Sequence, residues 1–219
     1  MGLPLLLKTG APLPRWLPLA EPAAVFTLVL LYIWRLRFTA PASWLPILGL
    51  VLLSHYVHGE EPADLGFRRA GFAACVREIA PAVLLMALAL WSAGALFQTV
   101  RPMPFENGVA AYAAYCLWGL FQQYLLNAYF LNRLAAVLPP RRVPLLAAAL
   151  FAAVHLPNGF LMAVTFPAGY LCARVYLRHR NLYALGLAHA ALGFLLYLVV
   201  PDAVSHHLRV GPSWFRGGP

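Results

Sequence analysis

The sequence predicts an all-α fold, a polytopic transmembrane helix bundle of about seven spans. Of the 219 residues, 62% are hydrophobic and only 11% are charged, whereas globular domains carry roughly a quarter charged residues. This much apolar surface cannot be hidden inside one soluble domain of that length, so membrane lipid is its expected partner. The same apolar content excludes intrinsic disorder.

Charged residues and prolines divide the chain into apolar runs. The predicted spans are 23–34, 42–57, 79–100, 109–131, 143–156, 160–176 and 182–200. Several are shorter than the roughly 20 residues that cross a bilayer as a helix, so flanking residues must extend them, and an eighth, poorly apolar span stays open. We expect an interfacial lead-in over 1–22, one transmembrane domain over 23–200 with its motif-bearing core at 109–200, and a tail over 201–219.

Lys and Arg fall unevenly on the two sides of such a bundle. With seven spans, eleven of them lie on the side of the N-terminus and five on the other side. The positive-inside rule then places the N-terminus in the cytoplasm, and we expect a plasma membrane of the bacterial type. The net charge of +9 fits basic loops facing anionic lipid. A nucleic-acid partner is not expected, because no basic run carries interleaved aromatic residues.

Polar side chains interrupt three of the apolar runs. They are Gln122, Gln123 and Asn127 in the fourth, His155 and Asn158 at the end of the fifth, and His189 in the seventh. At a rise of about 1.5 Å per residue, Gln123, His155 and His189 lie roughly 15, 18 and 10 Å below one membrane face. Polar groups in a bilayer usually face the bundle interior, so we expect one shared pocket. The alternative is ordinary interhelical hydrogen bonds, each worth about 0.6 kcal/mol.

The order of these residues resembles a known family. A polar pair, then FxxxH, then a later histidine is the motif order of the CPBP intramembrane endopeptidases, also called the CAAX-protease and bacteriocin-processing (Abi) family. The first motif, EExxxR, is matched by Gln122, Gln123 and Asn127, the second by Phe151 and His155, and the third, HxxxN, by His189 with Gly193 in its last position. The likeness covers roughly residues 63–200 and is strongest from Gly119 onward.

The resemblance implies hydrolysis of a peptide bond in a membrane-anchored or prenylated peptide or protein. In the family a glutamate acts as general base on water, while histidines and an asparagine hold that water and the developing oxyanion. The expected catalytic residues are Gln122, Gln123, His155, His189 and Asn158, and Asn127 and Phe151 are expected to bind substrate. Asn158 enters as a substitute for the missing third-motif asparagine, against the alternative of an ordinary turn or cap residue.

The two glutamines weaken the prediction of an enzyme. Glutamine has no basic site at physiological pH, and a general base supplies on the order of 10²–10⁴-fold in rate. Three explanations stay open: a peptidase with His155 or His189 as base, a pseudoprotease that holds a membrane segment without cutting it, or a glutamate replaced to trap a complex. Asn127 speaks against the last, because a trapping variant would keep the arginine. A small membrane transporter or scaffold is the alternative from another class.

No metal or other cofactor is expected. Two histidines from different spans could hold zinc, but catalytic zinc usually takes three protein ligands, amides are poor third ligands, and the sequence has no HExxH motif. The adjacent Glu60 and Glu61 look like the missing carboxylate pair, yet they lie in a loop beside Asp64, Arg68 and Arg69. We expect that loop to be solvated, with its charges paired at the surface.

Overall fold

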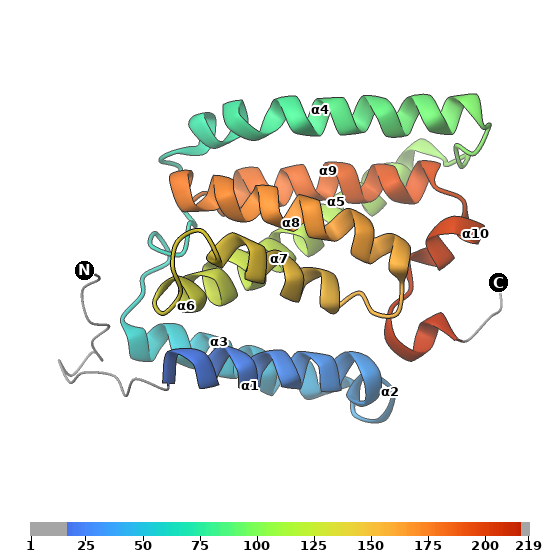
Figure 1. Ribbon diagram of the computed structural model, residues 1–219. Helices are drawn as coiled ribbons and strands as arrows, with labels where there is room; N and C mark the ends of the chain where they lie inside the picture. The colour runs from blue at the N-terminus through green and yellow to red at the C-terminus, as the bar shows by residue number, and fades with distance from the viewer. Residues whose placement is uncertain (1–16, 216–219) are drawn as a thin grey trace.

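The computed structural model describes residues 17–215, and all regular structure in that range is helical (Figure 1). The long helices are α1 (Leu17–Leu31), α3 (Trp44–His58), α4 (Phe72–Leu96), α5 (Phe105–Gln123), α7 (Val143–Ala153), α8 (Gly159–His179) and α9 (Leu182–Val199). The shorter ones are α2 (Arg37–Thr39), α6 (Asn132–Ala135) and α10 (Asp202–Ser205), and π-helical turns continue α1 over Tyr32–Leu36 (η1) and α5 over Tyr124–Leu131 (η3). The all-α prediction is confirmed for the described residues.

The helices form a bundle in which α9 packs against both α4 and α5, and α7 packs against α8. Successive long helices alternate in direction, with α4 at one edge of the bundle and the α1–α3 pair at the opposite edge (Figure 1). This arrangement brings η3, α7 and α9, the elements that carry the motif residues, into the middle of the fold.

Between residues 17 and 215, four helices are long and apolar enough to cross a membrane. They are Leu19–Thr39, Phe72–Leu96, Gly159–His179 and Leu182–Val199. Helix α7 is apolar but has only 11 residues. Large apolar side chains are exposed on α4, among them Leu84 at 68% and Leu85 at 71%, as expected of a surface covered by lipid. The chain is an integral membrane protein by these features, and the count of seven spans stays a prediction.

Two boundaries differ from those expected. The predicted span over 79–100 begins earlier, because α4 already starts at Phe72 after Gly71 in the left-handed conformation (φ 78°). The helix can include Glu78 because that carboxylate pairs with Arg178 and with His179 Nε2, 2.7 Å away, at the end of α8. The last residues of the predicted lead-in are also helical, since α1 begins at Leu17.

The predicted tail folds back onto the bundle as far as it is described. Backbone N–H of Gly211 donates to the carbonyl of Leu156 at 2.7 Å, and Arg37 Nη2 donates to Ser213 Oγ at 2.9 Å. Residues 1–16 of the lead-in and 216–219 of the tail lie outside the described residues.

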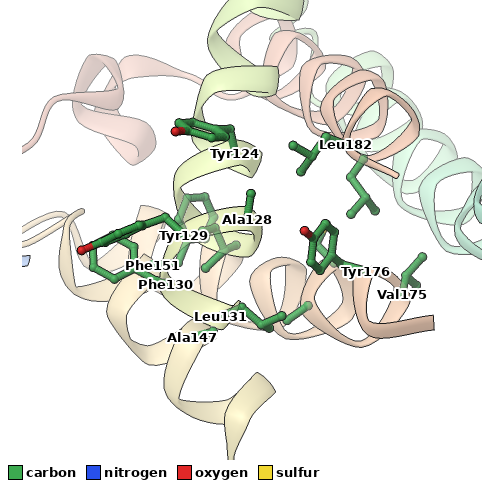
Figure 2. Close-up of a cluster of buried hydrophobic side chains, with 14 of the residues drawn as sticks. Tyr124, Ala128, Tyr129, Phe130, Leu131, Ala147, Phe151, Val175, Tyr176 and Leu182 are labelled. Atoms are coloured by element: carbon green, nitrogen blue, oxygen red, sulfur yellow. The ribbon is translucent and has the colours of Figure 1, made fainter. Parts of the chain in front are cut away.

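Segment η3 lies at the centre of the buried apolar cluster (Figure 2). In a π-helix the turn is wider than in an α-helix, and such turns are frequent at functional sites. The labelled side chains around it are Ala147 and Phe151 from α7, Val175 and Tyr176 from α8, and Leu182 from α9, next to Tyr124, Ala128, Tyr129, Phe130 and Leu131 of η3 itself. Packing on several sides therefore fixes the backbone that carries the first motif.

Helices α5 and α9 approach closely because glycines face each other. A Cβ on Gly119 would lie 2.9 Å from the carbonyl oxygen of Gly186 and 3.3 Å from the His189 ring. A Cβ on Gly186 would lie 3.0 Å from Leu120 Cα. Because the nearest obstacle at each glycine is a backbone atom, a side chain at either position must push the helices apart.

We expect Gly119→Ala to destabilise the protein by about 1–3 kcal/mol, the usual cost of overpacking, and to displace His189 from Gln123. The measurement is the thermal unfolding midpoint in detergent. Gly49→Ala is the matched control, because Gly49 is a helix-interior glycine whose added methyl group would meet no neighbouring heavy atom within 4 Å. An unchanged midpoint for Gly119→Ala would contradict the close contact of α5 and α9.

Candidate active site

A row of hydrogen-bonded amides ends on His189. Asn127 Nδ2 donates to Gln123 Oε1 at 2.7 Å, and Gln123 Nε2 lies 3.0 Å from His189 Nδ1. Gln123 is 1% exposed and Asn127 is fully buried. The end of α5, segment η3 and helix α9 thus place their polar side chains in one buried chain of contacts, while the shared pocket stays a prediction.

Phe151 contacts both His155 and His189. Its ring lies edge-on to His155, with 5.2 Å between the ring centroids, and edge-on to His189 at 5.9 Å. The backbone carbonyl of Phe151 also accepts a hydrogen bond from His155 Nδ1 at 2.7 Å. The FxxxH spacing therefore has a local cause: it puts the histidine one helical turn after the carbonyl and ring that orient it.

These contacts assign the protons of the two imidazoles. The Phe151 carbonyl can only accept, so His155 carries its proton on Nδ1 and keeps a lone pair on Nε2. The Gln123 Nε2 amide donates to His189 Nδ1, so neutral His189 carries its proton on Nε2. One histidine can thus accept a proton and the other can donate a hydrogen bond.

Gln122 is a polar motif residue whose side chain keeps its hydrogen-bonding capacity. It is half-buried, and no hydrogen bond to its side chain is found within residues 17–215. Asn127 also keeps a buried Oδ1 acceptor with no partner in that range. The first-motif pair is therefore divided between a side chain engaged in the row, Gln123, and one still available, Gln122.

The comparisons with known proteins agree with the motif order. A family model described as Rce1-like, type II CAAX prenyl endopeptidase Rce1-like, matches residues 106–195. This part of the chain is similar to that family. All three motif regions, from Gln122 to His189, lie within the match, so the resemblance to the CAAX-protease family is confirmed there. No curated protein and no solved structure matches the chain.

Asn158, within the matched residues, has a structural role in this fold. Its Oδ1 accepts from Leu161 N at 3.0 Å and caps α8. Its Nδ2 donates to the carbonyls of Ser205 at 2.9 Å and Arg209 at 3.0 Å. The side chain is fully buried, and both amide hydrogens are already used. A role in holding the oxyanion stays a prediction, and it would require one of these bonds to break.

The expectation of a site without zinc stays a prediction. The polar side chains of the site are two histidines and carboxamides, whereas catalytic zinc usually takes three nitrogen, sulfur or carboxylate ligands. No group of three or more His, Cys, Asp or Glu side chains within the described range could hold a metal ion.

Glu60 corrects one expectation from the sequence. It is not part of a solvated surface pair, because both of its oxygens bind the guanidinium of Arg133, at 3.0 and 2.7 Å. Its Oε2 also lies 2.7 Å from His55 Nδ1, while Glu61 is exposed. The inward position of Glu60 follows from Gly59, whose left-handed conformation (φ 68°) ends α3 and turns the chain back.

Arg133 is the centre of a buried charged cluster that the sequence did not reveal. Its side chain is 2% exposed, and its Nε donates to Glu21 Oε1 at 3.0 Å. Its Nη2 donates to Ser54 Oγ at 2.7 Å. We call Arg133 with Glu21, Ser54, His55 and Glu60 the Arg133 cluster. It joins α6, inside the matched residues, to α1, α3 and the turn after α3, which precede the match.

The cluster holds Glu60 in its charged form. Burial by itself raises the pKa of that carboxyl, but the hydrogen bonds from His55 and Arg133 and the charge of Arg133 outweigh it and lower the pKa from 4.5 to about 2. Tyr129 completes the surroundings, with its hydroxyl 3.2 Å from Glu21 Oε1.

Arg133→Ala leaves two carboxylates without their buried partner, so we expect a loss of about 3–5 kcal/mol in the free energy of unfolding. Thermal unfolding in detergent measures it. Arg141→Ala is the control, because Arg141 is an exposed arginine of the next loop, and it should leave the midpoint unchanged. Equal midpoints for the two variants would contradict the cluster's role.

The Glu60 pKa gives the stability a pH dependence. A carboxyl whose folded pKa is depressed stabilises the fold above its unfolded pKa and loses that effect as the pH falls through the folded value. The free energy of unfolding should therefore fall between pH 4.5 and about 2. Glu60→Gln has no such carboxyl, so the difference between wild type and this variant should shrink across that window. A constant difference argues against an ionised Glu60.

Proposed function

We propose that the chain is an intramembrane endopeptidase of the CAAX-protease type. It cleaves a membrane-anchored or prenylated peptide by attack of water. The observation that carries this proposal is the hydrogen bond between Gln123 and His189, with His155 held against the same Phe151 ring. The proposed setting is a bacterial-type plasma membrane with the N-terminus in the cytoplasm, as the distribution of Lys and Arg favours.

In this proposal His155 replaces the glutamate of the family as general base. Its Nε2 lone pair takes a proton from water, and the water oxygen attacks the carbonyl carbon of the scissile peptide. The Nε2–H of His189 donates to the oxyanion that forms, and the free amide of Gln122 helps to hold the water. The proton on His155 then passes to the leaving amine as the C–N bond breaks. No cofactor takes part.

A pseudoprotease is the second candidate, and the glutamines favour it. Without a carboxylate at 122 or 123, the site lacks the group that supplies on the order of 10²–10⁴-fold in the family's reaction. Such a protein would hold the membrane segment at the same site and release it uncut. Binding of the segment by Asn127 and Phe151, both buried, stays a prediction.

Cleavage of a fluorogenic prenylated peptide by the full chain in proteoliposomes tests the proposal. We expect His155→Ala and His189→Ala each to lower kcat/KM by on the order of 10²-fold, while Gln122→Glu raises it. His207→Ala is the control, since His207 is exposed near the C-terminal end. Activity should also survive a metal chelator.

The outcomes separate the two candidates. Cleavage that depends on both histidines supports the peptidase. Saturable binding of the peptide without cleavage, with turnover appearing only in Gln122→Glu, supports the pseudoprotease. An unchanged kcat/KM in both histidine variants would contradict the proposed site.

A further inference from the structure

A groove of about 730 Å³ opens at the end of the bundle where α4 and α9 begin. It is lined by Phe67, Arg68, Arg69, Phe72 and Tyr183. Its volume is within the range of small-molecule sites, roughly 300–1,000 Å³. None of these residues belongs to the proposed peptidase machinery, and the groove combines aromatic walls with two guanidinium groups.

The loop that forms the groove is held rigidly. Arg68 donates from Nε to the carbonyl of Arg180 at 3.2 Å and from Nη2 to that of His179 at 3.1 Å. Asn181 Nδ2 donates back to the Arg68 carbonyl at 2.7 Å. Gly71 lies so close to α8 that a Cβ there would be 2.8 Å from the His179 oxygen. The guanidinium of Arg68 is thus positioned before any ligand arrives.

The positive charge of the groove is not neutralised by nearby carboxylates. Arg69 is exposed, and over residues 17–215 its side chain makes no hydrogen bond or ion pair. In the same range, the hydrogen bonds of the Arg68 guanidinium all go to backbone carbonyls. The acidic side chains nearby are engaged elsewhere, since Glu78 pairs with Arg178 and His179 and Asp64 accepts from the backbone of Glu61.

Aromatic rings make the wall beside these charges. The Phe67 ring contacts Tyr183 at 6.0 Å and Tyr124 at 5.7 Å between centroids. Phe72 is 37% and Tyr183 40% exposed. An occupant that satisfies both halves of the groove needs an anionic head and an apolar body. The groove also lies on the arginine-rich side predicted to face the cytoplasm, where membranes expose anionic lipid and basic pockets between helices bind lipid head groups.

We propose that this groove is a binding site for an anionic phospholipid. Arg68 and Arg69 bind its phosphate, and its acyl chain lies along Phe67, Phe72 and Tyr183. The site takes a lipid of the surrounding membrane as ligand and stands apart from the peptidase chemistry, so it does not depend on whether the chain cleaves peptides.

Native mass spectrometry of the purified full chain with added phosphatidylglycerol tests this. We expect Arg69→Gln to weaken binding about fivefold and the Arg68→Gln, Arg69→Gln double variant about 25-fold, from about 1 kcal/mol per basic residue. Arg77→Gln is the matched control, because Arg77 is an exposed arginine of α4 outside the groove, and it should bind as the wild type does. Arg69 is exposed and makes no hydrogen bond or ion pair with its side chain among the described residues, so this variant keeps the test decisive even if the double variant unfolds.

Two further probes decide what is recognised. Phosphatidylcholine should bind more weakly than phosphatidylglycerol, and glycerol phosphate, which has the head but no acyl chain, should not displace the lipid. Equal retention of the two lipids, equal binding by Arg69→Gln and wild type, or full displacement by glycerol phosphate would each overturn the proposal. If the wild-type chain binds the lipid but does not cleave the peptide, the result counts against the proposed peptidase and leaves the lipid site standing.

Discussion

The rest of this fold depends on the burial of one guanidinium. A charge taken out of water costs several kcal/mol unless partners surround it, and Arg133 finds those partners in Glu21, Ser54 and Glu60. They come from α1, from α3 and from the turn after α3, so their chemistry dictates where these helices lie. Because Arg133 lies two residues after the end of η3, the same contacts hold the end of the segment that carries Asn127.

The candidate site depends on backbone approach as much as on its polar groups. Gln123 reaches His189 because α5 and α9 meet at Gly119 and Gly186, where a methyl group would collide with main-chain atoms. On the other side, Phe151 holds His155 by its carbonyl and touches both histidines with its ring. Two glycines and the Phe151 side chain thus bring motif residues that are far apart in the sequence into contact.

The helical class, the membrane and the meeting of Gln123 with His189 could all be predicted, because composition and helical rise are local properties of a sequence. The Arg133 cluster could not. From the sequence alone, Glu21 belongs to the predicted lead-in, Ser54 and His55 belong to an apolar run, and Glu60 belongs to a loop. Only tertiary structure brings them to one arginine more than 70 positions later. Asn158 is a different case, since its sequence position fits a cap and a catalytic amide equally well, and the structure adds the cap.

Asn158 has a consequence for where the folding unit ends. Its two amide hydrogens are satisfied by the Ser205 and Arg209 carbonyls, both of which lie beyond the family match at 106–195. A fragment limited to the matched residues would bury the Asn158 amide without its two acceptors. It would also bury the Arg133 guanidinium without the carboxylates of Glu21 and Glu60. The minimal autonomous unit therefore reaches back to Glu21 and forward to at least Arg209.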